Sequence, residues 1–142
     1  VGSEMCIRDS VKGMLRALKS GNRVWYAPDH DYGTRRSTFA PLFAVKRACT
    51  TTGTSLLVDA TDCVIVPFTM VRGSNGQYTL TISAPVEGFP KNDPDKAALF
   101  VNKIVEQSIM ASPSQYMWLH RRFKTRPDGE RCLYKPRLEP AM

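Results

Sequence analysis

Patterns for metal binding and for membrane spanning are both missing from this sequence. The cysteines are Cys6, Cys49, Cys63 and Cys132. None of them forms a CxxC pair, so their spacing indicates neither a zinc site nor a disulfide framework and favours a reducing, cytosolic setting. The longest apolar run, residues 63–71, contains Pro67 and is less than half of the roughly 20 residues that a spanning helix needs. We therefore expect no membrane span in this chain.

Acidic residues are scarce relative to basic ones. The chain has 13 Asp and Glu against 20 Lys and Arg, which gives a net charge of +7 over 142 residues. A chain of this length forms one domain with a real core. A basic surface prefers anionic partners. Nucleic acid, acidic carrier proteins, phospholipid head groups and phosphorylated glycolipids all fit this description, and composition does not choose among them.

The sequence also lacks an initiator methionine at position 1. Its first ten residues, "VGSEMCIRDS", have no clear period and resemble a translated sequencing-adapter remnant. We therefore expect residues 1–10 to be a non-native lead and the remainder to be the C-terminal part of a longer protein. A natural frayed terminus is the alternative, and it predicts the same disorder in a complete protein.

Hydrophobic periodicity predicts three helices. Apolar residues at helical spacing between Val11 and Leu18 indicate an amphipathic helix that Gly21 closes. Residues 50–61 predict a second helix, preceded by threonine caps, and residues 93–111 a long third one with Asp95 near its positive end.

Three further segments read as strands. Residues 24–27 indicate a short buried strand that ends at Pro28, so residues 29–36 form a loop at its carboxyl end, where open α/β sheets place ligands. Residues 63–72 and 78–82 predict a hairpin with one wet face. This order of elements favours an α/β domain over a bundle or a sandwich. The basic residues 120–137 predict an extended surface segment.

The loop after the first predicted strand carries Asp29, His30 and Asp31, which support three interpretations. In an extended segment the two aspartates share one side, which suits a D-x-D clamp for a divalent metal. Alternatively, Asp29 orients an imidazole or an arginine from another strand end. The third interpretation is a turn without further function, because Pro, Asp and Gly build turns.

A second cluster follows the long helix. His120, Arg121 and Arg122 could grip a phosphate or a carboxylate. The alternative is a solvated basic edge with Tyr116, Trp118 and Leu119 packed inward, since most charge runs face water. The same alternative applies to Arg35 and Arg36. The aromatic residues sit mostly in apolar contexts, which argues against a nucleic-acid stripe.

Four longer stretches occur in a family-specific order. They are "VWYAPDHDYG", "FAPLFAV", "TTTGTSLL" and "VNKIVEQSIMASPSQYMWLHRRFKTRP". Together they resemble the C-terminal half of the secondary acyltransferases of lipid A biosynthesis, and most closely the members that add laurate to a precursor bearing Kdo. The resemblance covers residues 11–127, while residues 128–142 are expected to be an extended tail. Thr34 stands where relatives usually carry proline.

The resemblance implies a fold, a reaction and partners. The expected fold is a glycerolipid-acyltransferase-like α/β domain, a mixed sheet flanked by helices, incomplete at its N-terminus. The expected reaction moves a fatty acyl chain from acyl carrier protein to a hydroxyl of a phosphorylated lipid A precursor. No metal, cofactor or nucleic-acid partner is expected. The implied location is the cytoplasmic face of the bacterial inner membrane, with the anchor upstream.

The resemblance also assigns roles to residues. Asp29 matches an aspartate that the family needs for activity. His30, Asp31, Tyr32, Gly33 and Arg35 are expected to shape the substrate pocket, and His120, Arg121 and Arg122 to meet its phosphates or carboxylates; these eight are the implied substrate-binding residues. Gly33 allows the backbone to approach the substrate.

The family's catalytic dyad, His-x4-Glu or His-x4-Asp, can be sought directly. The sequence has two histidines, His30 and His120, and the fifth residues after them are Arg35 and Thr125. Neither is a carboxylate, so we expect this polypeptide alone to be inactive. Two alternatives from other classes are a D-x-D glycosyltransferase part that binds manganese and a basic module that binds acidic lipid or nucleic acid through residues 120–137.

Overall fold

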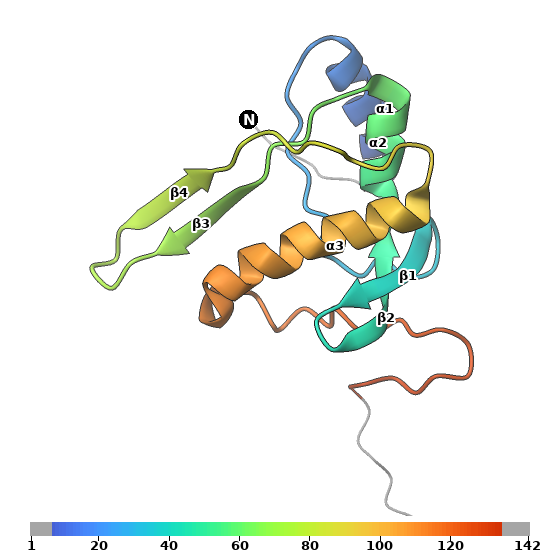
Figure 1. Cartoon of the computed structure of the whole chain (residues 1–142), viewed down its shortest axis with the longest axis vertical. Helices are drawn as coiled ribbons and strands as arrows, with labels where there is room; N and C mark the ends of the chain where they lie inside the picture. Colours follow the sequence, from blue (N-terminus) through green and yellow to red (C-terminus); the bar gives the residue numbers. More distant parts are fainter. Residues whose placement is uncertain (1–6, 135–142) are drawn as a thin grey trace, which may run out of the picture.

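The protein is a mixed α/β structure with two small sheets (Figure 1). The computed structural model describes residues 7–134. In chain order the elements are α1 (Ile7–Lys19), β1 (Ser37–Leu42), β2 (Val45–Thr51), α2 (Gly53–Thr61), β3 (Phe68–Arg72), β4 (Tyr78–Ile82), α3 (Pro94–Ala111) and the 3-10 turn η1 (Pro113–Gln115). The α/β class is therefore confirmed, while the glycerolipid-acyltransferase-like arrangement stays a prediction.

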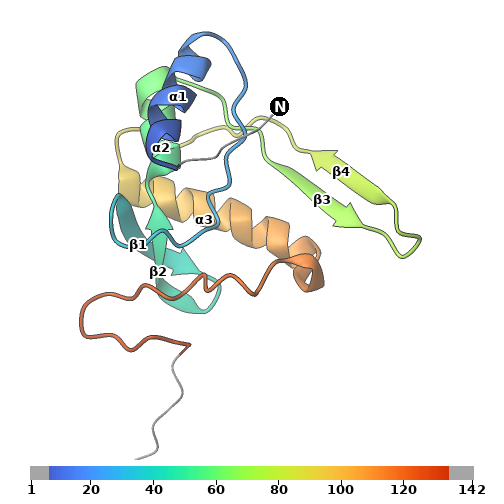
Figure 2. The same cartoon turned by 180° about the vertical axis from the view of Figure 1, so that it is seen from behind.

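The core lies between the β1–β2 hairpin and α3, which crosses it (Figures 1 and 2). The hairpin is antiparallel from Ser37 opposite Thr51 to Leu42 opposite Val45, with a register shift after Ala40. Its buried apolar residues pack against α3, which also contacts α2. The buried apolar residues of these elements are Ala40, Leu42, Ala48, Cys49, Leu57, Val58, Ala97, Ala98, Val101 and Ile109. Small side chains dominate this set, which lets α3 approach the sheet closely.

One polar side chain of α3 is fully buried in that core. Asn102 accepts a hydrogen bond from Thr50 Oγ1 at 3.2 Å and donates from Nδ2 to the Pro41 carbonyl at 2.9 Å. The Asn102 amide therefore supplies a donor to a backbone carbonyl at the register shift of β1. There Pro41 lacks a backbone N–H and the regular ladder is interrupted.

All three predicted helices are confirmed, with different starts. The first begins at Ile7, so residues 7–10 belong to α1 rather than to an unstructured lead, and residues 1–6 lie outside the described residues. The second begins at Gly53, because residues 50 and 51 complete β2. Thr52 is its N-cap by position only, since its hydroxyl donates to the Arg36 carbonyl. In α3 the cap is a true one: the Asp93 side chain accepts from Lys96 N.

The strand predicted at residues 24–27 is wrong. This stretch runs without a ladder partner, and the Trp25 side chain is 59% exposed. A strand forms only where a neighbouring backbone takes its hydrogen bonds. Among residues 7–134 each sheet has two strands, and neither includes this stretch.

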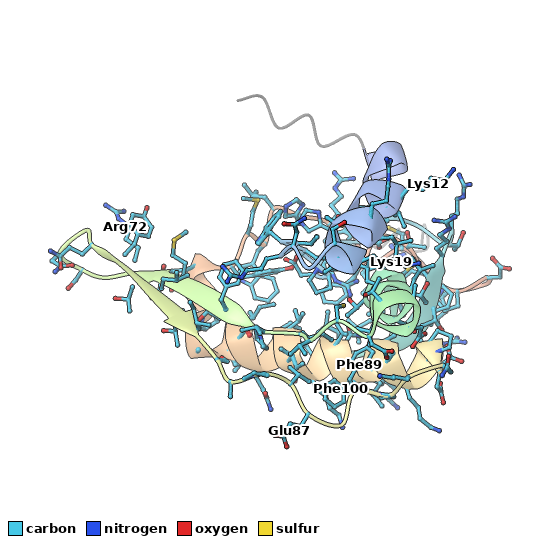
Figure 3. The ribbon with its side chains drawn as sticks, turned by 90° about the horizontal axis from the view of Figure 1, so that it is seen from above. Lys12, Lys19, Arg72, Glu87, Phe89 and Phe100 are labelled. Atoms are coloured by element: carbon cyan, nitrogen blue, oxygen red, sulfur yellow. The ribbon has the colours of Figure 1, made fainter. Side chains whose placement is uncertain are left out.

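The hairpin of β3 and β4 is confirmed, but β3 begins at Phe68 rather than at residue 63. It projects from the body (Figure 1), and Figure 3 places Arg72 at its far end. The prediction that only one face of the hairpin is exposed to solvent is wrong, because the apolar side of β4 is exposed as well as the threonine side. No helix among the described residues is long and apolar enough to cross a membrane.

Candidate functional site

The two polar clusters of the sequence come together in space. The rings of His30 and His120 lie with their centroids 4.1 Å apart. Thr125, which is 94 residues beyond Asp31, donates its backbone N–H to Asp31 Oδ2 at 2.8 Å. The segment after η1 therefore folds back onto the loop that follows Pro28. We call the group formed by Asp29, His30, Tyr32, Tyr116 and His120 the aspartate–histidine cluster.

Asp31 fixes the shape of the loop and its contact with the C-terminal segment. Its Oδ1 accepts from Gly33 N at 3.0 Å, an Asx turn, and its Oδ2 accepts from Thr125 N. Gly33 has a φ of +83°, a conformation that favours glycine. Both carboxylate oxygens of the buried Asp31 are thus engaged by backbone donors, which disfavours a D-x-D clamp with Asp29. Among residues 7–134 no group of three His, Cys, Asp or Glu is placed to hold a metal ion.

Asp29 supplies the negative charge of the aspartate–histidine cluster. Its Oδ1 lies 4.0 Å from His30 Nε2, longer than a hydrogen bond. Burial, and after it the charge of Asp29, raise the pKa of Tyr116 to about 12. The same two causes raise the pKa of Tyr32. The carboxylate is partly exposed at its side chain, so it can accept a hydrogen bond from a group that the rest of a larger site contributes.

The Tyr116 hydroxyl is buried and makes no hydrogen bond of good geometry to any group of residues 7–134. The pKa rise from 10.0 to about 12 means that the folded chain keeps this proton where the unfolded chain releases it. The stability that follows is fully present below pH 10 and is lost as the pH rises toward 12. We expect the free energy of unfolding to fall less steeply across this window in Tyr116→Phe than in the wild type. Denaturant unfolding at a series of pH values measures the slopes.

The matched control is Tyr78→Phe, which removes the same hydroxyl from the exposed strand β4. Equal slopes for Tyr116→Phe and the wild type would show that the Tyr116 hydroxyl is not held in its neutral form by the fold.

The three residues of the second cluster have different environments. Arg122 is 2% exposed and donates to the Cys49 carbonyl at 2.6 Å and to Thr50 Oγ1 at 3.2 Å. Burial lowers the pKa of its guanidinium. Arg121 is exposed and His120 is half-buried against His30. The observed contacts of Arg122 hold strand β2, whereas Arg121 is open to a ligand, as is Arg35 on the loop.

The predicted extended surface segment at residues 120–137 is therefore wrong in part. No helix or strand forms between residues 120 and 134, as expected, but Arg122 reaches into the core. Residues 135–137 lie outside the described residues. Of the side chains expected to pack inward, Leu119 is 93% exposed. Trp118 packs against Tyr116, with ring centroids 4.9 Å apart, and against Phe43.

A surface hollow among the described residues lies elsewhere. It lies at the β1–β2 turn and is lined by Ala44, Val45, Lys46, Arg47, Arg126, Glu130 and Leu133. It contains an ion-pair network in which Glu130 bonds both Arg47 and Arg126. Since these arginines are already paired, we place the candidate site at the aspartate–histidine cluster.

Two residues that shape this site were not predicted from the sequence. Tyr116 was expected only as a packed aromatic, and Thr125 acts through its backbone N–H, which every residue except proline carries. No pattern in the sequence could have identified Thr125. A buried tyrosine hydroxyl near a carboxylate could have been suspected only once residues 29 and 116 were known to be neighbours.

Comparison with known proteins identifies the family of this chain. A sequence model of the family described as bacterial lipid A biosynthesis acyltransferase matches residues 1–125. The chain is 52% identical over 126 residues to the lipid A biosynthesis lauroyltransferase of Escherichia coli K12 and 48% identical over 128 residues to its palmitoleoyltransferase. These alignments cover 88% and 89% of this chain, and 41% and 42% of the relatives.

More distant relatives follow the same pattern. The lipid A biosynthesis myristoyltransferase of the same organism is 29% identical over 128 residues, which are 89% of this chain and 39% of the relative. The chain thus spans about two fifths of the length of the curated relatives that it matches. The family match covers far more than half of this sequence, and the chain belongs to the bacterial lipid A biosynthesis acyltransferase family.

Proposed function

We propose that this chain forms part of an enzyme that transfers a fatty acyl chain, laurate, from acyl carrier protein to a hydroxyl of a Kdo-bearing lipid A precursor. The proposal places the reaction at the cytoplasmic face of the inner membrane. The observation that carries it is the meeting of the aspartate loop with His120 in a chain of this family. Laurate is chosen because the lauroyltransferase shares the higher identity of the two E. coli relatives above.

The chemistry requires a base and a positioned carboxylate. The acceptor hydroxyl gives up its proton while its oxygen forms a bond to the thioester carbonyl carbon. The carbon–sulfur bond then breaks, and the thiolate of the carrier takes a proton. Neither histidine of this chain stands in a His-x4-Glu or His-x4-Asp motif, so the proposed base comes from the remainder of the enzyme. Asp29 is proposed to orient that base, since a carboxylate stabilises an imidazolium.

The exposed arginines are proposed to have a separate role, in substrate binding. Arg35 and Arg121 are exposed, and they lie on the two segments that meet at the aspartate–histidine cluster. A guanidinium presents several donors to a phosphate or a carboxylate. We propose that these two side chains contact the acidic groups of the precursor. Arg122 is proposed to act indirectly, because its guanidinium is buried and both Nη1 and Nη2 donate to β2.

The experiment is a chimera in which this chain replaces the aligned part of the E. coli lauroyltransferase. We expect the chimera to transfer laurate from acyl carrier protein to the Kdo-bearing precursor in preference to palmitoleate. The 142-residue chain alone is expected to transfer neither. Product formation by mass spectrometry, with the two donors in competition, measures both results.

The natural lauroyltransferase is the positive control for this assay. A chimera that is folded but inactive would contradict the proposed reaction. Transfer by the 142-residue chain alone would contradict the proposal that the base lies elsewhere. A preference for palmitoleate would overturn only the choice of laurate.

A further inference from the structure

The hairpin of β3 and β4 exposes an apolar face. Along residues 62–72 exposure alternates strictly, and the more exposed positions include Val64, Val66, Phe68 and Met70. On the partner strand Tyr78, Leu80 and Ile82 are exposed too. These seven side chains are each between 45% and 68% exposed. We call them the hairpin face. A contiguous apolar patch of this kind is unusual on a soluble monomer and marks an interaction surface.

The register puts the hairpin face on one side of the sheet. Phe68 lies opposite Ile82, and Met70 lies opposite Leu80. Residues 69 and 71 lie opposite Thr81 and Thr79, so the other side is rich in threonine. The pairing continues beyond the strands, because Ser83 N donates to the Pro67 carbonyl and Val86 N donates to the Ile65 carbonyl, both at 2.9 Å. The face is therefore one continuous surface rather than a set of scattered residues.

Unlike β4, whose alternating residues predict one wet face, β3 and the residues before it favour burial on both faces. Residues 63–71 form a nearly unbroken apolar run, which is typical of a strand buried on both faces. In the structure one side is half-buried and the other is open. An isolated two-stranded hairpin is marginal in water. A second layer over the hairpin face would remove its apolar side chains from water and bury both sides of β3.

The composition of the hairpin decides which partner fits. Its tip, residues 73–77, is polar, and Arg72 is the one charged residue within β3 and β4. A segment that lies on a membrane surface is rich in Lys and Arg on its polar face. The other face of this hairpin is rich in threonine instead, so its apolar face fits another protein layer.

The identity of that layer follows from the coverage of the relatives. This chain matches only 41% of the lauroyltransferase and 42% of the palmitoleoyltransferase. The larger part of each relative therefore has no counterpart here and is available to cover the hairpin. We propose that the hairpin face packs against the part of a lipid A acyltransferase that lies outside the region matched by this chain. This inference rests on family membership and not on the proposed acyl transfer.

Cysteine labelling tests the proposal in two proteins. One is the 142-residue chain, and the other is the chimera described above, extracted into detergent. In both, the four natural cysteines are replaced by serine, and a single cysteine is introduced by Leu80→Cys or by Thr79→Cys. These neighbours on β4 point to opposite faces. A maleimide probe then reports the accessibility of each position.

We expect the cysteine of Leu80→Cys to react readily in the 142-residue chain and at least 10-fold more slowly in the chimera. The Thr79→Cys control is expected to react at similar rates in both proteins. Circular dichroism and size-exclusion chromatography show whether each variant is folded and monomeric.

Three outcomes overturn the proposal. Equal labelling at position 80 in both proteins means that the matched relative does not cover the hairpin face. Slow labelling in the 142-residue chain, with elution as a dimer, identifies a second copy as the occupant. If position 80 of the chimera is protected from the probe in vesicles but not in detergent, the lipid bilayer is the layer that covers the hairpin face. Each outcome is independent of whether the chimera transfers an acyl group.

Discussion

Replacing Asp29 with asparagine in the chimera is expected to lower the turnover of laurate by about 100-fold, the scale of general acid–base assistance. The neutral amide keeps the size of the side chain but removes the charge that raises the pKa of Tyr116 and Tyr32. The proposed base then loses the carboxylate that orients it and stabilises its protonated form. Steady-state kinetics measure kcat and KM separately, and we expect the loss in kcat.

A purely structural role for Asp29 makes the opposite prediction. If Asp29 only builds the turn, Asp29→Asn would lower the free energy of unfolding of the 142-residue chain and leave turnover unchanged. We expect that free energy to stay within about 0.5 kcal/mol of the wild type, as for surface changes. The matched control is Asp128→Asn, an exposed aspartate of the same chain outside the aspartate–histidine cluster.

Replacing Arg122 with alanine is expected to destabilise the chain by about 3 kcal/mol, because two hydrogen bonds from a charged donor and a buried side chain are lost together. The Cys49 carbonyl and the Thr50 hydroxyl both lose a donor inside the core. Thr50 in turn is bonded to Asn102 of α3, so the change affects the contact between helix and sheet. Urea unfolding followed by circular dichroism measures the effect.

The neighbouring residue provides the control for Arg122. Arg121 has the same side chain but is exposed, and Arg121→Ala is expected to change stability by less than about 0.5 kcal/mol. A third variant, Arg122→Met, keeps much of the apolar volume and removes the donors. If Arg122→Met is as stable as the wild type, the hydrogen bonds to β2 contribute nothing net, and the argument from the buried polar contacts is wrong.

The helices were predictable because their information is local. The apolar positions of α1 and α3 repeat at helical spacing, and Asp93 and Gly21 stand where a cap and a stop are needed. The β1–β2 hairpin was not predicted. Its strands contain Pro41, and its pairing depends on contacts across the turn and beneath α3 rather than on a sequence period.

The strand expected at residues 24–27 illustrates the same limit. Its residues favour an extended backbone, and the segment runs without regular helix or strand, but strand formation needs a partner that residues 7–134 do not offer. Arg122 illustrates the converse. A run of basic residues normally faces water. Here Arg122, one of two adjacent arginines, is buried because the Cys49 carbonyl and the Thr50 hydroxyl accept its hydrogen bonds.

By itself the sequence determined the family, the three helices, the loop character of residues 29–36 and the absence of a His-x4-Glu or His-x4-Asp motif. These are properties of neighbouring residues or of whole motifs, and they can be read along the chain. Only the tertiary structure decided that His30 meets His120, that Arg122 is buried and that the hairpin face is open. Each of these depends on residues far apart in sequence, because burial and contact are determined by which distant segments of the chain pack against one another.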